Sequence, residues 1–236
     1  MIILTAGHTG PNTGAQCAAT QFDEGAENIW LRNRIAEILT NKYGLVVLMD
    51  DDTASLKLLV KELNQTGRQD DTKNHVLMSS CRNQTSEASP TVDCRLLSVD
   101  DIVIDLHFNA HSNPNARGTE AIVANDATTL ELRFASRLAH TTSDALDIPL
   151  RCIKSESETP HHRLAMLHLT PQSIILEVCF CTSPEDVDAY RKHREQLAAE
   201  LAWAIAELLP SVVSTDNSQQ TSPDGDCRPL TVDRRL

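Results

Sequence analysis

The run Ile2-Ile3-Leu4-Thr5-Ala6-Gly7-His8 begins the chain with a continuous, mostly apolar segment that ends in a histidine. An uninterrupted run of this kind is typical of a strand that is buried on both faces of a parallel sheet. Two later runs are similar: Asp101–Leu106 leads into His107, and Ser173–Leu176 leads into Glu177. The carboxyl ends of parallel strands gather at one edge of an open α/β sheet. The sequence therefore predicts that the three polar residues lie close together.

Helical periodicity follows these predicted strands. An apolar stripe from Ile29 to Leu39, preceded by Asp23 in the N-cap position, predicts a helix that ends near Gly44. Further strands are predicted at 45–49 and 120–124, and further helices at 55–63, at about 130–145 and within 184–209. This alternation favours a three-layer α/β fold with about six mostly parallel strands and helices on both faces of the sheet.

The chain is expected to form one catalytic domain, residues 1–210, followed by a short tail. Residues 67–99 are polar and lack periodicity, which predicts an insertion, a lid or a mobile loop within that domain. Residues 211–236 are rich in Ser, Asp, Gln, Pro and Gly, a composition typical of a disordered tail.

One octet of the sequence is repeated. Residues 93–100 recur as 226–233, with seven of the eight positions identical or Ser/Thr-equivalent. The repeat could be a docking element used twice, a sign that Cys94 and Cys227 bond, or an accidental duplication, and these interpretations stay open. Seven cysteines without zinc-ribbon spacing predict that most are reduced, small apolar residues rather than metal ligands.

Composition excludes several classes of function. A formal net charge of −12 argues against a nucleic-acid-binding or anionic-membrane surface. Because no apolar stretch reaches about 18 residues, no membrane span is expected. The N-terminal residues lack the basic and long apolar regions of a secretory signal, so we expect a protein that is cytoplasmic when made.

His8, Glu24, His107 and Glu177 carry the predicted chemistry. Two imidazoles and a carboxylate are a ligand set of catalytic zinc, which keeps one position open for water. Zinc lowers the pKa of this water, and a further carboxylate must accept its proton. The pattern predicts a metal-dependent hydrolase in which the first three residues are ligands and Glu177 is the base.

Each of these residues also has an ordinary structural interpretation. His8 could be only a loop residue, and Glu24, which opens a predicted helix, would be favoured there by the helix dipole without any metal. Glu177 could form a salt bridge with Arg163 or Lys154. An unpaired carboxylate on an apolar strand is costly, however, so Glu177 is the most informative of the four.

Short motifs surround these residues. The most specific are His107-Phe108-Asn109-Ala110 and Leu176-Glu177 through Phe180, and the others are Gly7-His8, Gly14-Ala15, Glu24 with Asn28 and Ile29, Gly118-Thr119-Glu120, Arg151 with Lys154, and Asp186. With these motifs the chain resembles the zinc-dependent N-acetylmuramoyl-L-alanine amidases of the type-3 amidase group over most of residues 1–209. Thr9 departs from the usual Gly-His-Gly-Gly loop, and the segment 67–99 is not a feature of the family.

The resemblance implies an enzyme that cuts peptidoglycan between N-acetylmuramic acid and L-alanine, in lysis or cell-wall remodelling. It implies zinc bound by His8, Glu24 and His107. Asn109, Arg151, Lys154 and Arg163 are expected to contact the substrate. Without an export signal, the chain looks similar to a phage endolysin. The alternatives are a zinc carboxypeptidase or deacetylase acting on cell-wall glycopeptide, and a non-catalytic muropeptide-binding module.

Overall fold

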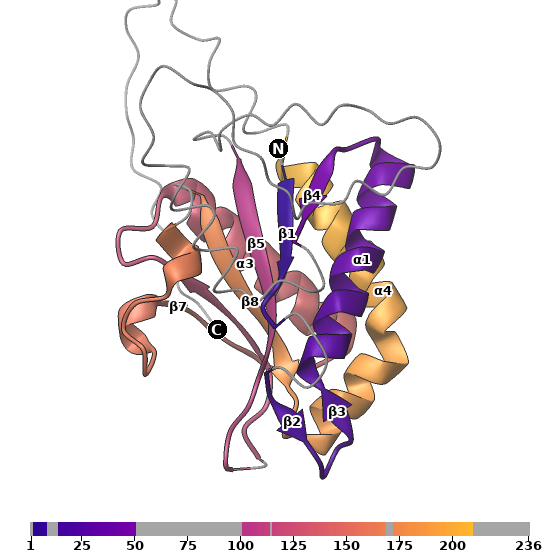
Figure 1. Ribbon diagram of the computed structural model, residues 1–236, viewed down its shortest axis with the longest axis vertical. Helices are drawn as coiled ribbons and strands as arrows, with labels where there is room; N and C mark the ends of the chain where they lie inside the picture. The colour runs from indigo at the N-terminus through magenta and orange to yellow at the C-terminus, as the bar shows by residue number, and fades with distance from the viewer. Residues whose placement is uncertain (1, 9–13, 51–100, 114, 169–171, 210–236) are drawn as a thin grey trace, which may run out of the picture.

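The computed structural model describes residues 2–8, 14–50, 101–113, 115–168 and 172–209 (Figure 1). The predicted helix at 55–63, the segment 67–99, both copies of the octet and the tail lie outside the described residues.

A six-stranded sheet forms the centre of the fold. Its order is β4-β1-β5-β8-β6-β7, and neighbours are parallel except for β6 and β8. The strands span Ile2–Ala6 (β1), Val47–Met49 (β4), Ile102–Asn109 (β5), Thr119–Val123 (β6), Leu150–Ser155 (β7) and Ser173–Phe180 (β8). The predicted class, a three-layer α/β fold with a mostly parallel sheet of six strands, is confirmed.

Two parts of the strand content were not predicted. β7 has the sequence Leu-Arg-Cys-Ile-Lys-Ser and lies at the edge of the sheet, where its half-exposed residues give no apolar run. A small antiparallel hairpin, β2 (Gln16–Cys17) and β3 (Phe22–Asp23), is too short to leave a periodic signal.

The described α-helices are α1 (Glu24–Tyr43), α3 (Thr129–Leu146) and α4 (Pro184–Leu208). The predicted ends of α1 are confirmed: the side chain of Asp23 accepts a hydrogen bond from the amide of Ala26, and Gly44 adopts a left-handed conformation with φ 67°. Within the described part of the chain, no helix is long and apolar enough to cross a membrane.

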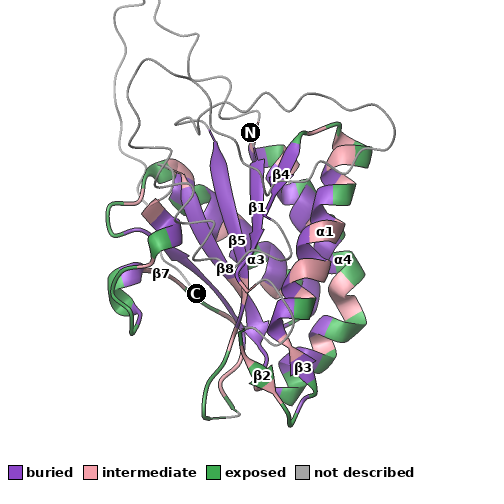
Figure 2. Cartoon of the chain, in the orientation of Figure 1, coloured by how far each residue is buried: buried purple, intermediate pink, exposed green. Residues whose placement is uncertain are grey.

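All three of these helices pack on one face of the sheet, where α4 contacts both α1 and α3 (Figure 1). Apart from the edge strand β7, the strands of the sheet are buried almost throughout (Figure 2). On the opposite face, Leu167 from the short 3-10 helix η2 (Ala165–His168) packs with Ile122 and Ile175. Among the described residues, the layer on this opposite face is therefore thinner than the layer formed by the three α-helices.

Alternation along the central strands separates polar from apolar residues. In β5, Ile104 and Leu106 belong to the core under the helices. Because successive side chains of a strand point to opposite faces, Asp105 and His107 face away from the helices. Glu177 of β8 pairs with His107 in the parallel register and lies on the same face.

A buried ion pair joins α1 to the sheet next to His8. Arg32 Nη1 lies 2.6 Å from Asp50 Oδ1, and that oxygen also accepts a hydrogen bond from the amide of Ala6 at 3.1 Å. The contact fixes the carboxyl end of β1 against the helix that begins with Glu24.

Asp186, in the first turn of α4, fixes a second junction. It is fully buried, and its carboxylate accepts hydrogen bonds from the amides of Gly118 (2.7 Å) and Phe180 (3.2 Å) and from Arg117 Nε (3.0 Å). The start of α4 is thereby held against the end of β8 and the start of β6.

We predict that Asp186→Ala lowers the free energy of unfolding by about 3 kcal/mol, because two buried amides lose their acceptor. Urea denaturation measures the change. The matched control is Asp188→Ala, an exposed aspartate one half-turn further along α4, which should change stability by less than about 0.5 kcal/mol. Equal stability of the two variants would contradict the prediction.

Candidate metal centre

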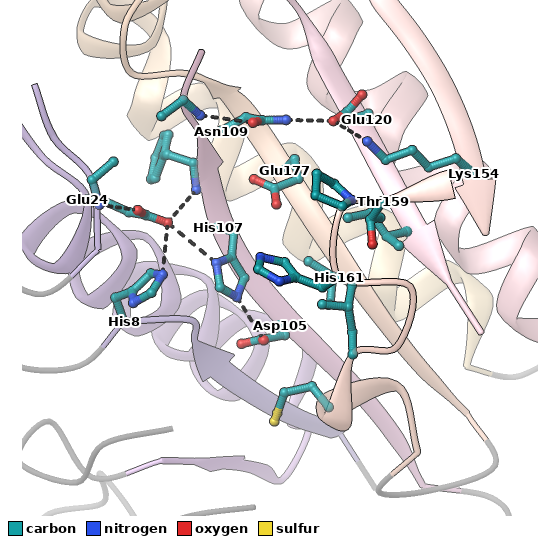
Figure 3. A pocket seen from close by; sticks show the side chains of 18 of the residues that line it. His8, Glu24, Asp105, His107, Asn109, Glu120, Lys154, Thr159, His161 and Glu177 are labelled. Carbon is teal, nitrogen blue, oxygen red and sulfur yellow. Dashed lines mark hydrogen bonds and ion pairs between the residues drawn. The ribbon is translucent and has the colours of Figure 1, made fainter. Parts of the chain in front are cut away.

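The carboxylate of Glu24 lies between the two histidines. Its Oε1 atom is 3.4 Å from His107 Nδ1 and 3.8 Å from His8 Nε2. The amides of Phe108 and Ala15 donate to Oε1 (3.1 Å) and Oε2 (2.7 Å). Glu24 therefore receives its position from the start of α1, from β5 and from the loop before β2 (Figure 3).

Two glycines make room for these side chains. A Cβ atom on Gly14, whose φ is +75°, would lie 2.6 Å from Glu24 Oε2 and 2.8 Å from the His8 ring. A Cβ atom on Gly7 would lie 2.0 Å from the His107 ring. The imidazole rings are nearly perpendicular, with an interplanar angle of 85° and centroids 5.2 Å apart.

The three side chains fit a divalent ion. One ligand atom from each of His8, Glu24 and His107 lies within 4.8 Å of the other two. Tetrahedral zinc with bonds of about 2.0–2.1 Å separates its ligand atoms by about 3.3 Å. The two distances from Glu24 Oε1 approach this value, and two imidazoles with a carboxylate have the chemistry of a catalytic zinc site. The structure thus brings together the three predicted ligands.

His107 also contacts the carboxylate of Asp105, whose Oδ2 atom lies 3.0 Å from Nε2. Burial alone would lower the pKa of His107, but Asp105 and Glu24 together raise this pKa well above its ordinary value. Burial would raise the pKa of Glu24, but hydrogen bonds from His107 and Ala15 lower it. The local field therefore favours positive charge at this position.

Glu177 lies beside His107 with few polar contacts. Among the described residues its Oε2 atom is buried and has no hydrogen-bond partner. Burial raises the pKa of Glu177 to about 7, and the nearby Glu24 and Glu120 add to the effect. The alternative of a salt bridge does not hold in the described chain: Lys154 pairs with Glu120 instead, and no contact joins Glu177 to Arg163.

Glu120 forms hydrogen bonds with three of the side chains that were expected to contact the substrate. It is 3% exposed and accepts hydrogen bonds from Asn109 Nδ2 (2.6 Å), Lys154 Nζ (2.7 Å) and Arg151 Nε (3.2 Å). In the sequence, Glu120 stands in the Gly118-Thr119-Glu120 motif, at the start of the predicted strand 120–124, and was not predicted to be a site residue. Like Glu177, Glu120 is a carboxylate on a predicted buried strand. The same signal could therefore have identified Glu120 as a site residue.

A pocket of about 490 Å³ connects these groups (Figure 3). Its polar wall carries the candidate ligands with Glu177, Glu120, Asn109 and Lys154, and its apolar wall is formed by Ile122, Leu164, Met166 and Ile175. Thr159, Pro160 and His161 form the rim. Arg151 and Arg163 are not among the lining residues; Arg151 stacks on Phe180 at 4.9 Å, and Arg163 is exposed.

The rim is held by Glu156, which is buried beneath it. Glu156 accepts hydrogen bonds from the amide of Leu164 (2.7 Å) and lies 2.9 Å from His168 Nε2. His161, in the loop after Pro160, is one of the residues that line the pocket.

Solved structures with a similar fold include N-acetylmuramoyl-L-alanine amidases and the catalytic domain of an endolysin. An N-acetylmuramoyl-L-alanine amidase from Clostridium difficile 630 is 20% identical with a TM-score of 0.61, and the match covers 92% of this chain and 97% of that one. The amidase of Mycobacterium smegmatis is 15% identical with a TM-score of 0.59, covering 89% and 96%. The catalytic domain of an endolysin that targets Clostridia difficile is 20% identical with a TM-score of 0.54, covering 89% and 96%.

No curated protein matches the chain. The family described as N-acetylmuramoyl-L-alanine amidase, however, matches residues 2–208, nearly all of the described fold and every residue of the pocket. The chain therefore belongs to the N-acetylmuramoyl-L-alanine amidase family and is an enzyme of that class, a hydrolase of an amide bond in peptidoglycan.

Proposed function

We propose that the protein hydrolyses the amide bond between the lactyl group of N-acetylmuramic acid and L-alanine, using zinc held by His8, Glu24 and His107 and Glu177 as the base. The observation that carries the proposal is the unpartnered, buried oxygen of Glu177 beside the three clustered ligands. A buried carboxylate oxygen without a partner is costly, and a proton-transfer role accounts for it.

A bound zinc ion would supply Lewis acidity and a water of lowered pKa. Glu177 would accept the proton of this water and pass it to the departing alanine nitrogen. The raised pKa of Glu177, about 7, suits a group that must both take and give a proton near neutral pH.

Asn109 and Lys154 would contact the substrate from the polar wall of the pocket, where Glu120 holds them in place. Because Glu120 already offsets the charge of Lys154, this residue is suited to donating a hydrogen bond to a carbonyl or hydroxyl group. Arg151 and Arg163, which lie outside the pocket lining, would meet carboxylates of the stem peptide.

Cleavage of this bond separates the stem peptide from the glycan, which suits lysis or remodelling of a cell wall. We assign the catalytic domain to residues 1–210, a range supported by the family match over 2–208. The alternatives of a carboxypeptidase, a deacetylase or a silent binding module are not favoured by that match. Mass spectrometry of digested peptidoglycan distinguishes them: the proposal requires intact stem peptides with a new N-terminal alanine, and loss of a terminal residue or of acetate would contradict it.

Replacement of the proposed base should slow the reaction. Glu177→Gln keeps the shape of the side chain but cannot accept a proton, so kcat should fall by about 10²- to 10⁴-fold. Release of N-terminal alanine from peptidoglycan measures the rate. Zinc content should stay at the wild-type level, and the surface variant Glu195→Gln should retain full activity. A rate within threefold of the wild type would reject Glu177 as the base.

Removal of a proposed histidine ligand should release the zinc ion. Purified protein should retain one zinc ion per chain, whereas His8→Ala and His107→Ala should lose it, because two remaining ligands hold zinc weakly. Elemental analysis after dialysis measures the stoichiometry. His140→Ala, which removes an exposed histidine of α3, serves as the control. Stoichiometric zinc in either ligand variant would show that the ion binds elsewhere.

A further inference from the structure

The two histidines of the site present different ring nitrogens to Glu24. In His8 the nitrogen nearest to Glu24 Oε1 is Nε2, whereas in His107 it is Nδ1. The Nε2 atom of His107 contacts Asp105 Oδ2 on the other side of the ring (Figure 3). The ring of His107 is therefore held between two carboxylates, one on each side.

We propose that Asp105 is a positioning residue that fixes His107 with Nδ1 toward the metal, so that the two histidines ligate zinc through different nitrogens. This inference rests on the proposed function, since it requires zinc to bind at His8, Glu24 and His107. It adds a residue that is not itself a ligand of the ion and acts through His107.

Asp105 is itself fixed by a neighbouring strand. The hydroxyl of Thr5 donates to Asp105 Oδ1 at 2.6 Å, and both residues are at most 1% exposed. The two residues are direct partners in the register of β1 and β5. With one oxygen engaged by Thr5, the other is presented to His107.

The chemistry of a carboxylate selects the tautomer. An ionised carboxylate only accepts hydrogen bonds, so its contact with Nε2 requires a proton on that nitrogen. A neutral imidazole protonated on Nε2 carries its lone pair on Nδ1, which is the form that a metal requires on that side. Asp105 thus favours the one tautomer whose lone pair faces Glu24.

Gly7 leaves room for the part of the His107 ring that carries Nε2. A Cβ atom on Gly7 would clash with both Cε1 and Nε2 of His107, so the ring packs directly on the backbone of Gly7, just after β1. The amide of Gly7 also donates to the carbonyl of Leu106 at 2.8 Å, which keeps this backbone in place. A side chain at position 7 would displace the His107 ring from this position.

A purely structural role for Asp105 makes a different prediction. If Asp105 only satisfies the hydroxyl of Thr5, its removal would lower stability but leave the ligating nitrogen and the zinc affinity of the folded protein unchanged. The tautomer of His107 and the zinc affinity therefore separate the two roles.

The test uses zinc-loaded protein labelled with ¹⁵N-histidine. Long-range ¹H–¹⁵N correlation spectra report which nitrogen of each ring carries the proton, and correlations from each imidazole to the backbone amide of its own residue assign the two rings without changing a ligand. The wild type should show His107 protonated on Nε2 and His8 protonated on Nδ1. Because this measurement needs no change at Asp105, it holds even where a variant fails to fold.

Zinc affinity, measured by competition with a chromophoric chelator, provides the second readout. Asp105→Ala should weaken binding by about 10- to 100-fold, the usual effect of removing a hydrogen-bond partner of a ligating histidine. Asp105→Asn, which retains an acceptor oxygen, should lose less, and Gly7→Ala should weaken binding although Asp105 is intact. Asp126→Asn, an exposed control, should bind as the wild type does.

Ligation of His107 through Nε2 in the wild type would overturn the inference. Wild-type zinc affinity in folded Asp105→Ala would overturn it as well. In both cases the protein still binds zinc, so the proposed function stands. Failure of the proposed function would instead appear as no zinc binding by the wild-type protein. That result would overturn this inference as well.

Discussion

The register between three neighbouring parallel strands is the constraint on which the site depends. β1, β5 and β8 pair so that Thr5 lies beside Asp105 and His107 lies beside Glu177. A shift of one residue in β5 would turn its polar side chains into the core under the helices and expose Ile104 and Leu106 on the other face. Burial of the apolar side chains of these strands under the helices therefore fixes the positions of their polar side chains on the opposite face.

This arrangement concentrates negative charge in one pocket. Glu24, Asp105, Glu120 and Glu177 all line it. Three of the four have nearby donors: backbone amides for Glu24, the hydroxyl of Thr5 for Asp105, and Lys154 with Arg151 for Glu120. Of these four carboxylates, only Glu177 has a buried oxygen, Oε2, that lacks a donor among the described residues. A divalent cation beside these groups would offset much of the repulsion between them, so charge and ligand geometry favour the same chemistry.

Local sequence signals predicted much of this structure. Continuous apolar runs identified β1, β5 and β8, and Asp23 and Gly44 marked the ends of α1 because capping chemistry is local. The four central residues could be found because each follows or opens such an element. The direction of β6 could not, since an apolar run reads the same in a parallel and an antiparallel strand. Lys154 was expected to contact substrate or Glu177, but its partner Glu120 is determined by the pairing of β6 with β7, which only the fold reveals.

The central claim is that a single ion joins two strand ends and a helix start. A crystal of the zinc-loaded protein, measured on both sides of the zinc absorption edge, tests it most directly. The account predicts one anomalous peak within bonding distance, about 2.0–2.2 Å, of His8 Nε2, Glu24 Oε1 and His107 Nδ1. A peak bound by other side chains, or no peak between these three, would contradict the account.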